Sequence, residues 1–408
     1  MKKNILSLLS LAVILSVSSC TVEIREDADM NGGGGGSTGG ETTGAVLDGT
    51  GTLTGTLSKN TLVKKGNYSL EGIVKVPEGI TLTIEAGATF TAKTSVGSSL
   101  VVLQGGKIMA AGTASEPVVF TSDNKKPGDW GGVTLYGNAP IKAINGASKA
   151  LSEDGNNVYY GGDNPNDNSG SLQFVRVEYG GKKIGDGTSE TNSMTFYAVG
   201  AGTVLENLVS YKGTDDGYEF FGGTVSGKNL VSYGNYDDAF DWQDSWSGQN
   251  NTNWFAYQTA VGNFGMEIES SGNADNTAPK VNGVTLIRAA GTKPETAGSI
   301  EISAIQFKKH GSGIFSNVYI DGYKNTDGKE AFAVLIQDAA TETEQVNQGK
   351  VVVSPVNHVN SDNLNIWGYA YAPNGGKTFT SDAAVKKVAL TPGNWATVNG
   401  VDLLAALK

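Results

Sequence analysis

The feature that most constrains this chain is an internal repeat of 22 residues. The segment NLVSYKGTDDGYEF begins at Asn207, and the segment NLVSYGNYDDAFDW begins at Asn229. Ten of the fourteen aligned positions are identical or closely similar, including both members of an Asp-Asp pair. A unit this short cannot bury its own apolar side chains, so successive units must stack on one another.

The residue types of the repeat favour strands over helices. Leu208, Val209, Tyr211, Tyr218 and Phe220 are strand formers in short runs broken by Gly and Asp, without helical periodicity. Helical repeats of the ankyrin or tetratricopeptide type need about 33 residues per unit. We therefore expect an all-β fold, a right-handed parallel β-helix with capped ends and loop insertions, whose coils lie about 4.8 Å apart. A β-propeller or a β-sandwich is the alternative.

Weaker copies of the repeat near Asn253 and Asn317 extend the pattern toward the C-terminus. Stacked strands cannot lengthen without losing register, so extra residues must lie in loops. The expected insertions are residues 150–170, 185–193, 243–253 and 270–280. The expected domains are a signal peptide at 1–19, a flexible acidic and Gly-rich tether at 20–46, a β-helix at 47–370 and a C-terminal cap at 371–408.

The N-terminus has the layout of an export signal. Lys2 and Lys3 precede an apolar run from Ile5 to Val17, which is too short to span a membrane but suits a signal peptide. The run ends at Cys20, the single cysteine of the chain, in a context that resembles the lipobox of bacterial lipoproteins. This resemblance predicts lipidation of Cys20 and a lipid-anchored protein of the outer membrane, exposed at the cell surface.

Composition excludes several kinds of site. The chain has one cysteine and two histidines, too few for a Cys/His zinc site, and one cysteine cannot form a disulfide within the chain. The formal net charge of −11 argues against nucleic acid as a partner, because nucleic acids are bound by basic surfaces.

Three further segments carry a family resemblance. They are GDWGGVTLYGNAPI from Gly128, DNSGSLQFVRVEYGG from Asp167, and GTDDGYEFFGGTVSGKNLVSYGNYDDAFDW from Gly213. Together they resemble uncharacterised β-helix lipoproteins of the cell surface that occur mainly in Bacteroidetes. The resemblance covers most of residues 50–390 and implies a fold and a location, but no established activity.

The repeat arranges carboxylates in columns. Because Tyr218 and Phe220 are expected to face inward, Glu219 should face outward, and the same alternation puts Asp241 outward. Two later Glu residues between apolar neighbours extend the expected column, which is Glu219, Asp241, Glu267 and Glu301. We expect Asp215 and Asp237 beside the column and Asp216 and Asp238 at the corner that enters each strand.

Stacked like charges about 5 Å apart repel by roughly 1–3 kcal/mol per pair. Bound Ca²⁺, nearby Lys212, Lys228 or Arg288, or protonation of one member could offset this repulsion. The column then has two readings: a ligand or metal site, or a ladder of solvated acids that only stabilises the coil.

The candidate residues follow from the first reading. The possible ligand-binding residues are Glu219, Asp241, Glu267, Glu301 and Trp246, the last as an exposed ring after Asp244. The possible Ca²⁺ ligands are Asp215, Asp216, Asp237 and Asp238. The candidate catalytic residues are Asp215, Asp237, Asp238 and Arg288. Trp242 and Trp254 are expected to face the core.

Two functions remain open. The first is a non-catalytic surface lipoprotein that binds a polysaccharide or another surface protein. The second is a Ca²⁺-dependent polysaccharide lyase with Arg288 or Lys308 as base, or a glycoside hydrolase that uses Asp residues of successive coils. Polygalacturonase-like hydrolases also carry Gly-His-Gly after such aspartates, and here His310 follows only some seventy residues later. That difference argues against the hydrolase.

Overall fold

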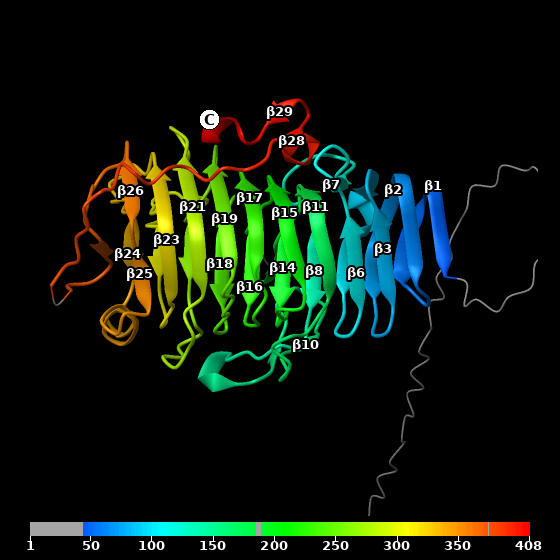
Figure 1. Cartoon of the computed structure of the whole chain (residues 1–408), viewed down its shortest axis with the longest axis horizontal. Coiled ribbons are helices and arrows are strands. Elements are labelled where there is room, and N and C mark those ends of the chain that lie inside the picture. The colour runs from blue at the N-terminus through cyan, green and yellow to red at the C-terminus, as the bar shows by residue number, and fades with distance from the viewer. Residues whose placement is uncertain (1–43, 185–188, 374) are drawn as a thin grey trace, which may run out of the picture.

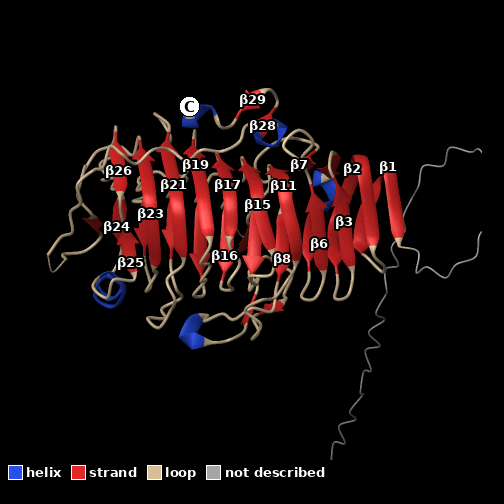
Figure 2. Cartoon of the chain, viewed as in Figure 1, coloured by secondary structure: helices blue, strands red, loops and turns tan. Residues whose placement is uncertain are grey.

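The structure is a computed structural model that describes residues 44–184, 189–373 and 375–408. The strands stand side by side along one long axis, from β1 (Ala45–Thr56) at one end to β26 (Val356–Val359) near the other (Figure 1). Strands and connecting loops make up nearly the whole molecule, with a few short helical turns (Figure 2). The expected signal peptide, Cys20 and the tether up to residue 43 lie outside the described residues.

Parallel pairings between coils form three ladders, one for each side of the coil. β1 and β2 (Thr61–Val76) bend through all three ladders. Ladders 1 and 2 share bent strands, which are β11 (Gly170–Glu178), β15 (Val204–Tyr211), β17 (Gly227–Tyr233), β19 (Asn251–Gln258), β21 (Lys280–Arg288) and β23 (Gly313–Asp321). This stacking is a parallel β-helix and excludes the propeller and the sandwich.

Shorter strands complete each ladder. Ladder 1 also contains β3 (Thr81–Glu85), β6 (Lys107–Ala111) and β25 (Val351–Val353). Ladder 2 also contains β4 (Ala88–Ala92), β7 (Val118–Ser122) and β26. Ladder 3 contains β5 (Ser99–Val102), β8 (Val133–Tyr136), β14 (Met194–Tyr197), β16 (Tyr218–Phe221), β18 (Phe240–Gln243), β20 (Met266–Ile268), β22 (Ile305–Phe307), β24 (Val334–Ile336) and β27 (Gly368–Tyr369).

The asparagine that opens each repeat makes the bend between ladders 1 and 2. Asn207, Asn229 and Asn253 have φ of 56°, 57° and 57°, the left-handed region that asparagine tolerates better than most residues. Their side chains also stack, because Asn229 Nδ2 donates to Asn207 Oδ1 at 2.8 Å and Asn253 Nδ2 donates to Asn229 Oδ1 at 3.0 Å. The recurrence of asparagine at this point of each coil therefore has both a backbone and a side-chain cause.

The 22-residue spacing predicts the register correctly. Leu208 pairs with Leu230 in ladder 2, and Glu219 pairs with Asp241 in ladder 3. Inward side chains form stacks along the axis, such as Phe196 on Phe220 with ring centroids 5.0 Å apart. Burying each such aromatic ring stabilises the coil by about 2–3 kcal/mol.

The remaining elements lie outside the ladders. Three antiparallel pairs are β9 (Ala150–Leu151) with β10 (Tyr159–Tyr160), β12 (Lys182–Ile184) with β13 (Ser189–Thr191), and β28 (Thr397–Val398) with β29 (Val401–Asp402). Helix α1 (Ala339–Thr341) is capped by Asp338 and continues into a π-turn at Glu342–Val346. Short 3₁₀ turns occur at Thr94–Val96, Ile144–Gly146, Asn394–Ala396 and Ala405–Leu407.

Much of the expected C-terminal cap, residues 371–408, lies along the side of the solenoid rather than over its end. Residues 385–408, which we name the C-terminal segment, run back along the outer side of ladder 2 (Figure 1). Its Trp395 backbone N–H donates to Ala114 O at 3.2 Å, and its Val388 N–H donates to Thr285 Oγ1 at 2.9 Å. The segment covers a side of the coil because that side is apolar, with Val209, Val231 and Phe255 facing it.

Candidate functional site

The outer side of ladder 3 holds the expected column of carboxylates. Glu219 pairs with Asp241, and Asp241 pairs with Glu267, on successive strands β16, β18 and β20. Their neighbours in each strand point into the core, as the alternation predicted. Asp216 and Asp238 lie at the corner before the strands, where Asp238 N–H donates to Asp216 Oδ1 at 2.9 Å. We name Asp215, Asp216, Glu219, Asp237, Asp238, Asp241 and Glu267 the carboxylate stack.

The assignment of Glu301 to this column is wrong. Strand β22 begins at Ile305, and Gln306 rather than Glu301 pairs with Glu267. Glu301 lies in the preceding turn, where it accepts a hydrogen bond from Ser299 Oγ at 2.7 Å. The Ile-Glu-Ile pattern misled the prediction because Ile-Gln-Phe, a few residues later, has the same alternation.

The stack is buried, which the sequence did not indicate. Glu219 is 5% and Asp241 9% exposed, so neither is a solvated surface acid. A long insertion between β8 and β11 packs beside them. Its Ile141 and Tyr160 lie in one cluster with Tyr197 and Phe221 of the outer side of ladder 3. The Tyr160 ring centroid lies 4.7 Å from that of Tyr197. Covering this side removes most of the water that would otherwise solvate the carboxylates.

Amide side chains compensate part of the buried charge. Asn192 Nδ2 donates to Glu219 Oε2 at 2.5 Å, and Gln243 Nε2 donates to Glu219 Oε1 at 3.0 Å. Asn263 Nδ2 donates to Asp237 Oδ1, and Phe264 N–H donates to Asp238 Oδ1 at 2.6 Å. These neutral donors orient the acids but add no positive charge.

Asp241 has an unsatisfied oxygen. Among the described residues no hydrogen-bond partner lies within reach of Asp241 Oδ1, although this atom is buried. A buried acceptor without a partner costs about 1–3 kcal/mol, and more when it is charged. Asp241 also belongs to two of the three groups whose carboxylate oxygens all lie within 4.8 Å of one another. These groups are Asp215 with Asp216 and Asp237, Asp216 with Glu219 and Asp241, and Asp238 with Asp241 and Glu267.

Burial raises the pKa values of the stack. Loss of water, followed by repulsion from neighbouring carboxylates, holds the pKa values of Asp216, Glu219, Asp238 and Asp241 well above their usual range. Burial also raises the pKa of Asp237 to about 7, against the opposing hydrogen bond from Asn263. Without a counter-ion the stack therefore retains protons at a pH at which exposed acids are ionised.

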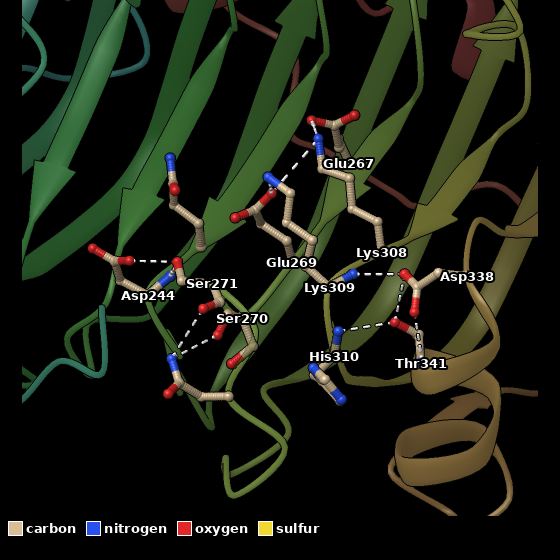
Figure 3. A network of polar contacts seen from close by, with 12 residues as sticks. Asp244, Glu267, Glu269, Ser270, Ser271, Lys308, Lys309, His310, Asp338 and Thr341 are labelled. Atoms are coloured by element: carbon tan, nitrogen blue, oxygen red, sulfur yellow. Dashed lines mark hydrogen bonds and ion pairs between the residues drawn. The ribbon is translucent and has the colours of Figure 1, made fainter. Parts of the chain in front are cut away.

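One lysine enters the stack from the next coil. Lys308 Nζ pairs with Glu267 and lies 3.6 Å from Glu269 Oε2 (Figure 3). Burial opposes its charge, but Glu267 and Asp241 outweigh burial and hold the pKa of Lys308 above its usual range. Lys309 Nζ pairs with Glu269 at 2.7 Å. Lys308 thus supplies a positive charge to one end of the stack.

Of the other basic residues expected to offset the column, Arg288 lies near Asp238, and Lys212 and Lys228 lie elsewhere. Lys228 pairs with Glu206 at 2.8 Å, and Lys212 Nζ lies 5.3 Å from the centroid of the Tyr211 ring. Arg288 is buried at the end of β21 and donates to Asn263 O at 2.7 Å. His310 Nε2 lies 3.3 Å from Glu344 Oε2, at the surface helix turn rather than at the stack.

Trp246 is not an exposed sugar-stacking ring. It is 1% exposed, stacks on Phe220 at 4.6 Å and donates through Nε1 to Val225 O at 3.0 Å. The chain turns inward before it, where Asp244 and Ser245 both have positive φ. Trp242 and Trp254 are buried in the same core cluster, as expected.

The donor set fits a hard divalent cation. Ca²⁺ takes six to eight oxygen ligands from carboxylates, carbonyls and water. Each of the three groups in the stack offers three carboxylate oxygens within 4.8 Å of one another, and Asp241 adds an acceptor that no described protein group satisfies. The two groups that contain Asp241 would hold such an ion: Asp216 with Glu219 and Asp241, or Asp238 with Asp241 and Glu267.

A parallel β-helix with a buried column of carboxylates on one outer side defines the class of this protein. Residues 54–392 match the family model described as a pectate-lyase-like β-helix domain, so the chain belongs to that family. No curated protein and no solved structure matches the chain. The family match agrees with the β-helix part of the resemblance found in the sequence, and the lipoprotein part stays a prediction.

Proposed function

We propose that this protein is a non-catalytic, lipid-anchored β-helix protein of the outer membrane that binds a glycan or a partner protein at the cell surface. The observation that carries the non-catalytic part is the burial of Glu219, Asp238 and Asp241. A catalytic acid or base must reach the substrate directly or through one water. Acids covered by an insertion and held by amide donors suit a structural role better.

We further propose that the carboxylate stack binds Ca²⁺. The ion would neutralise repulsion between stacked acids and accept coordination from Asp241 Oδ1, the buried atom without a described partner. In this role Ca²⁺ would stiffen the coils that present the binding surface. The ion would act only by neutralising the charge of the carboxylates.

A glycan panel tests the binding function. Purified mature protein is incubated with neutral and acidic polysaccharides, with Ca²⁺ and with EDTA, and both retention and cleavage are measured. The proposal expects retention of at least one glycan without new reducing or unsaturated ends. Cleavage that EDTA abolishes would overturn it.

The alternative function is a Ca²⁺-dependent polysaccharide lyase or a glycoside hydrolase. The half-buried Asp237 favours this alternative, because a pKa of about 7 suits a general acid or base at neutral pH. Lys308, beside Glu267, would be a second candidate for proton transfer. In the panel above, Asp237→Asn should then abolish cleavage while glycan retention persists.

The lipid anchor needs its own test, because Cys20 lies outside the described residues. No helix in the described part of the chain is both long and apolar enough to cross a bilayer. We expect metabolic labelling with an alkyne fatty acid to mark the wild-type protein but not Cys20→Ser. Protease treatment of intact cells would distinguish an outward-facing protein, which is degraded, from a periplasmic one.

A further inference from the structure

A separate pocket lies on the same side of the coil as the carboxylate stack. It has a volume of about 270 Å³ and includes Thr134 of β8. Thr134 pairs with Thr195, which pairs with Glu219, so the pocket lies two rungs before the stack. Two insertions form its sides, and the first is the one between β8 and β11 that also carries Tyr160. Asp154, Gly155 and Asn156 come from the first insertion, and Lys182 and Thr191 come from the β12–β13 pair.

The pocket combines a hydroxyl floor with one apolar edge. Ser99 and Thr134 form the floor from adjacent coils, and Thr191 adds a hydroxyl at the side. Ile73, which is 45% exposed, provides an apolar surface at the edge. In a ligand site, convergent polar groups fix the orientation of the ligand, and an apolar surface adds contact area.

Asp154 is fixed in a position to accept one further hydrogen bond. It is only 5% exposed, and it accepts from Tyr136 OH at 2.5 Å, Asn156 N–H at 3.0 Å and Asn156 Nδ2 at 2.7 Å. A carboxylate has about four acceptor positions, so three donors leave about one position. Across the pocket, the exposed side chain of Lys182 places its ammonium group against Gly97 and can act as a donor.

We propose that this pocket binds one unit of a neutral sugar, an inference that rests on the proposed glycan-binding function. A sugar ring offers hydroxyl donors to Asp154, hydroxyl acceptors to Lys182, and C–H groups to Ile73. The volume suits a single ring, since sites for larger ligands span about 300–1,000 Å³. The Asp154 carboxylate in the pocket and the net charge of −11 disfavour acidic sugars.

The test measures binding of maltotriose, cellotriose, xylotriose and trigalacturonate by isothermal titration calorimetry to the full mature protein. Two variants change the pocket: Lys182→Ala removes a donor, and Ser99→Leu fills the floor. Lys149→Ala, an exposed lysine of the first insertion outside the pocket, is the matched control. Circular dichroism and thermal unfolding confirm that each variant is folded.

We expect at least one neutral trisaccharide to bind, a tenfold or greater loss of affinity in Lys182→Ala, and no measurable binding in Ser99→Leu. Lys149→Ala should bind like the wild type. Unchanged affinity in both folded pocket variants would overturn the assignment of the sugar site to this pocket but leave the proposed glycan binding intact. Preference for trigalacturonate would refute the neutral class. Absence of binding to every probe, here and in the polysaccharide panel, would overturn the proposed function itself.

Discussion

Two outer sides of the same coils are covered by distant segments of the chain, one by the C-terminal segment and one by the insertion with Tyr160. One covered side is apolar, and the other carries carboxylates. The outer side of ladder 2 presents Val209, Val231 and Phe255 and is covered by the apolar side chains of the C-terminal segment. The outer side of ladder 3 presents Glu219 and Asp241, which are covered although they are acids.

This difference predicts which side of the solenoid makes the stability depend on pH and on Ca²⁺. Apolar burial depends little on pH or on divalent cations, so the ladder 2 side should give constant stability. Buried carboxylates require protons or a cation, so the ladder 3 side should carry nearly all of the pH and Ca²⁺ dependence.

The largest loss of stability is expected from a substitution that removes a buried apolar side chain of the C-terminal segment. Trp395 is fully buried, with its ring 5.9 Å from that of Phe174. Trp395→Ala should lower the free energy of unfolding by about 3–5 kcal/mol, measured by urea denaturation at pH 5 and pH 8. Val401→Ala, in the same segment but 46% exposed, is the control and should change little. A loss that differs strongly between the two pH values would contradict the claim that the ladder 2 side stabilises the fold independently of pH.

The next effect concerns Ca²⁺. At a free concentration one hundred times its Kd, a bound ion stabilises the folded state by about 2.7 kcal/mol. We expect Ca²⁺ added after EDTA treatment to raise the Tm at pH 8, and Asp241→Asn to remove most of that rise. Asp163→Asn, which alters an exposed acid, should keep the full rise. Equal shifts in both variants would place the ion outside the stack.

A third prediction concerns pH in the absence of Ca²⁺. The folded pKa of Asp237, about 7, lies above the usual value of 3.8, so the folded state holds a proton that the unfolded chain has lost. The contribution of this group to the free energy of unfolding is therefore full below about pH 4, and it is lost as the pH rises through about 7. Thermal unfolding in EDTA between pH 4 and 8 should show this decline, and Asp237→Asn should flatten part of it. A stability that rises over this range would contradict the raised pKa.

The smallest effect is expected at the asparagine bend between ladders 1 and 2, which lies in neither of the two covered outer sides. Asn229→Ala forces alanine into the left-handed region, at a cost of roughly 1–2 kcal/mol. Asn229→Gly relieves the strain but loses the hydrogen bonds to Asn207 and Asn253, each worth about 1 kcal/mol. Both losses should be independent of pH and Ca²⁺ in urea titrations. A Ca²⁺-dependent loss would show that the bend is coupled to the stack.

The sequence predicted the parts of the fold that depend on local pattern. Asn207 and Asn229 mark equivalent points of two coils, so the register of Glu219 over Asp241 followed directly from the repeat. Glu301 was misplaced because two adjacent segments share the same alternation, and only pairing with Glu267 distinguishes them. Trp246 was misplaced because its position in the loop after Asp244 suggested exposure, whereas the turn at Asp244 and Ser245 returns the chain to the core.

Burial of the site could not be predicted in the same way. The residues that cover or pair with the stack come from distant parts of the chain, such as Tyr160 in an insertion and Lys308 in a later coil. No periodicity in the repeat encodes these contacts. The C-terminal segment was likewise expected at the end of the solenoid, although the apolar Val209 and Val231 of the repeat were a signal that this side needed a cover.

The central claim is that the buried carboxylates hold protons which a divalent cation replaces. The most direct measurement is the number of protons released when Ca²⁺ binds to EDTA-treated protein in weakly buffered solution at pH 6. The account predicts stoichiometric Ca²⁺ binding with proton release, and loss of both in Asp241→Asn. Binding without proton release, or carboxyl groups that all titrate near pH 4, would contradict it.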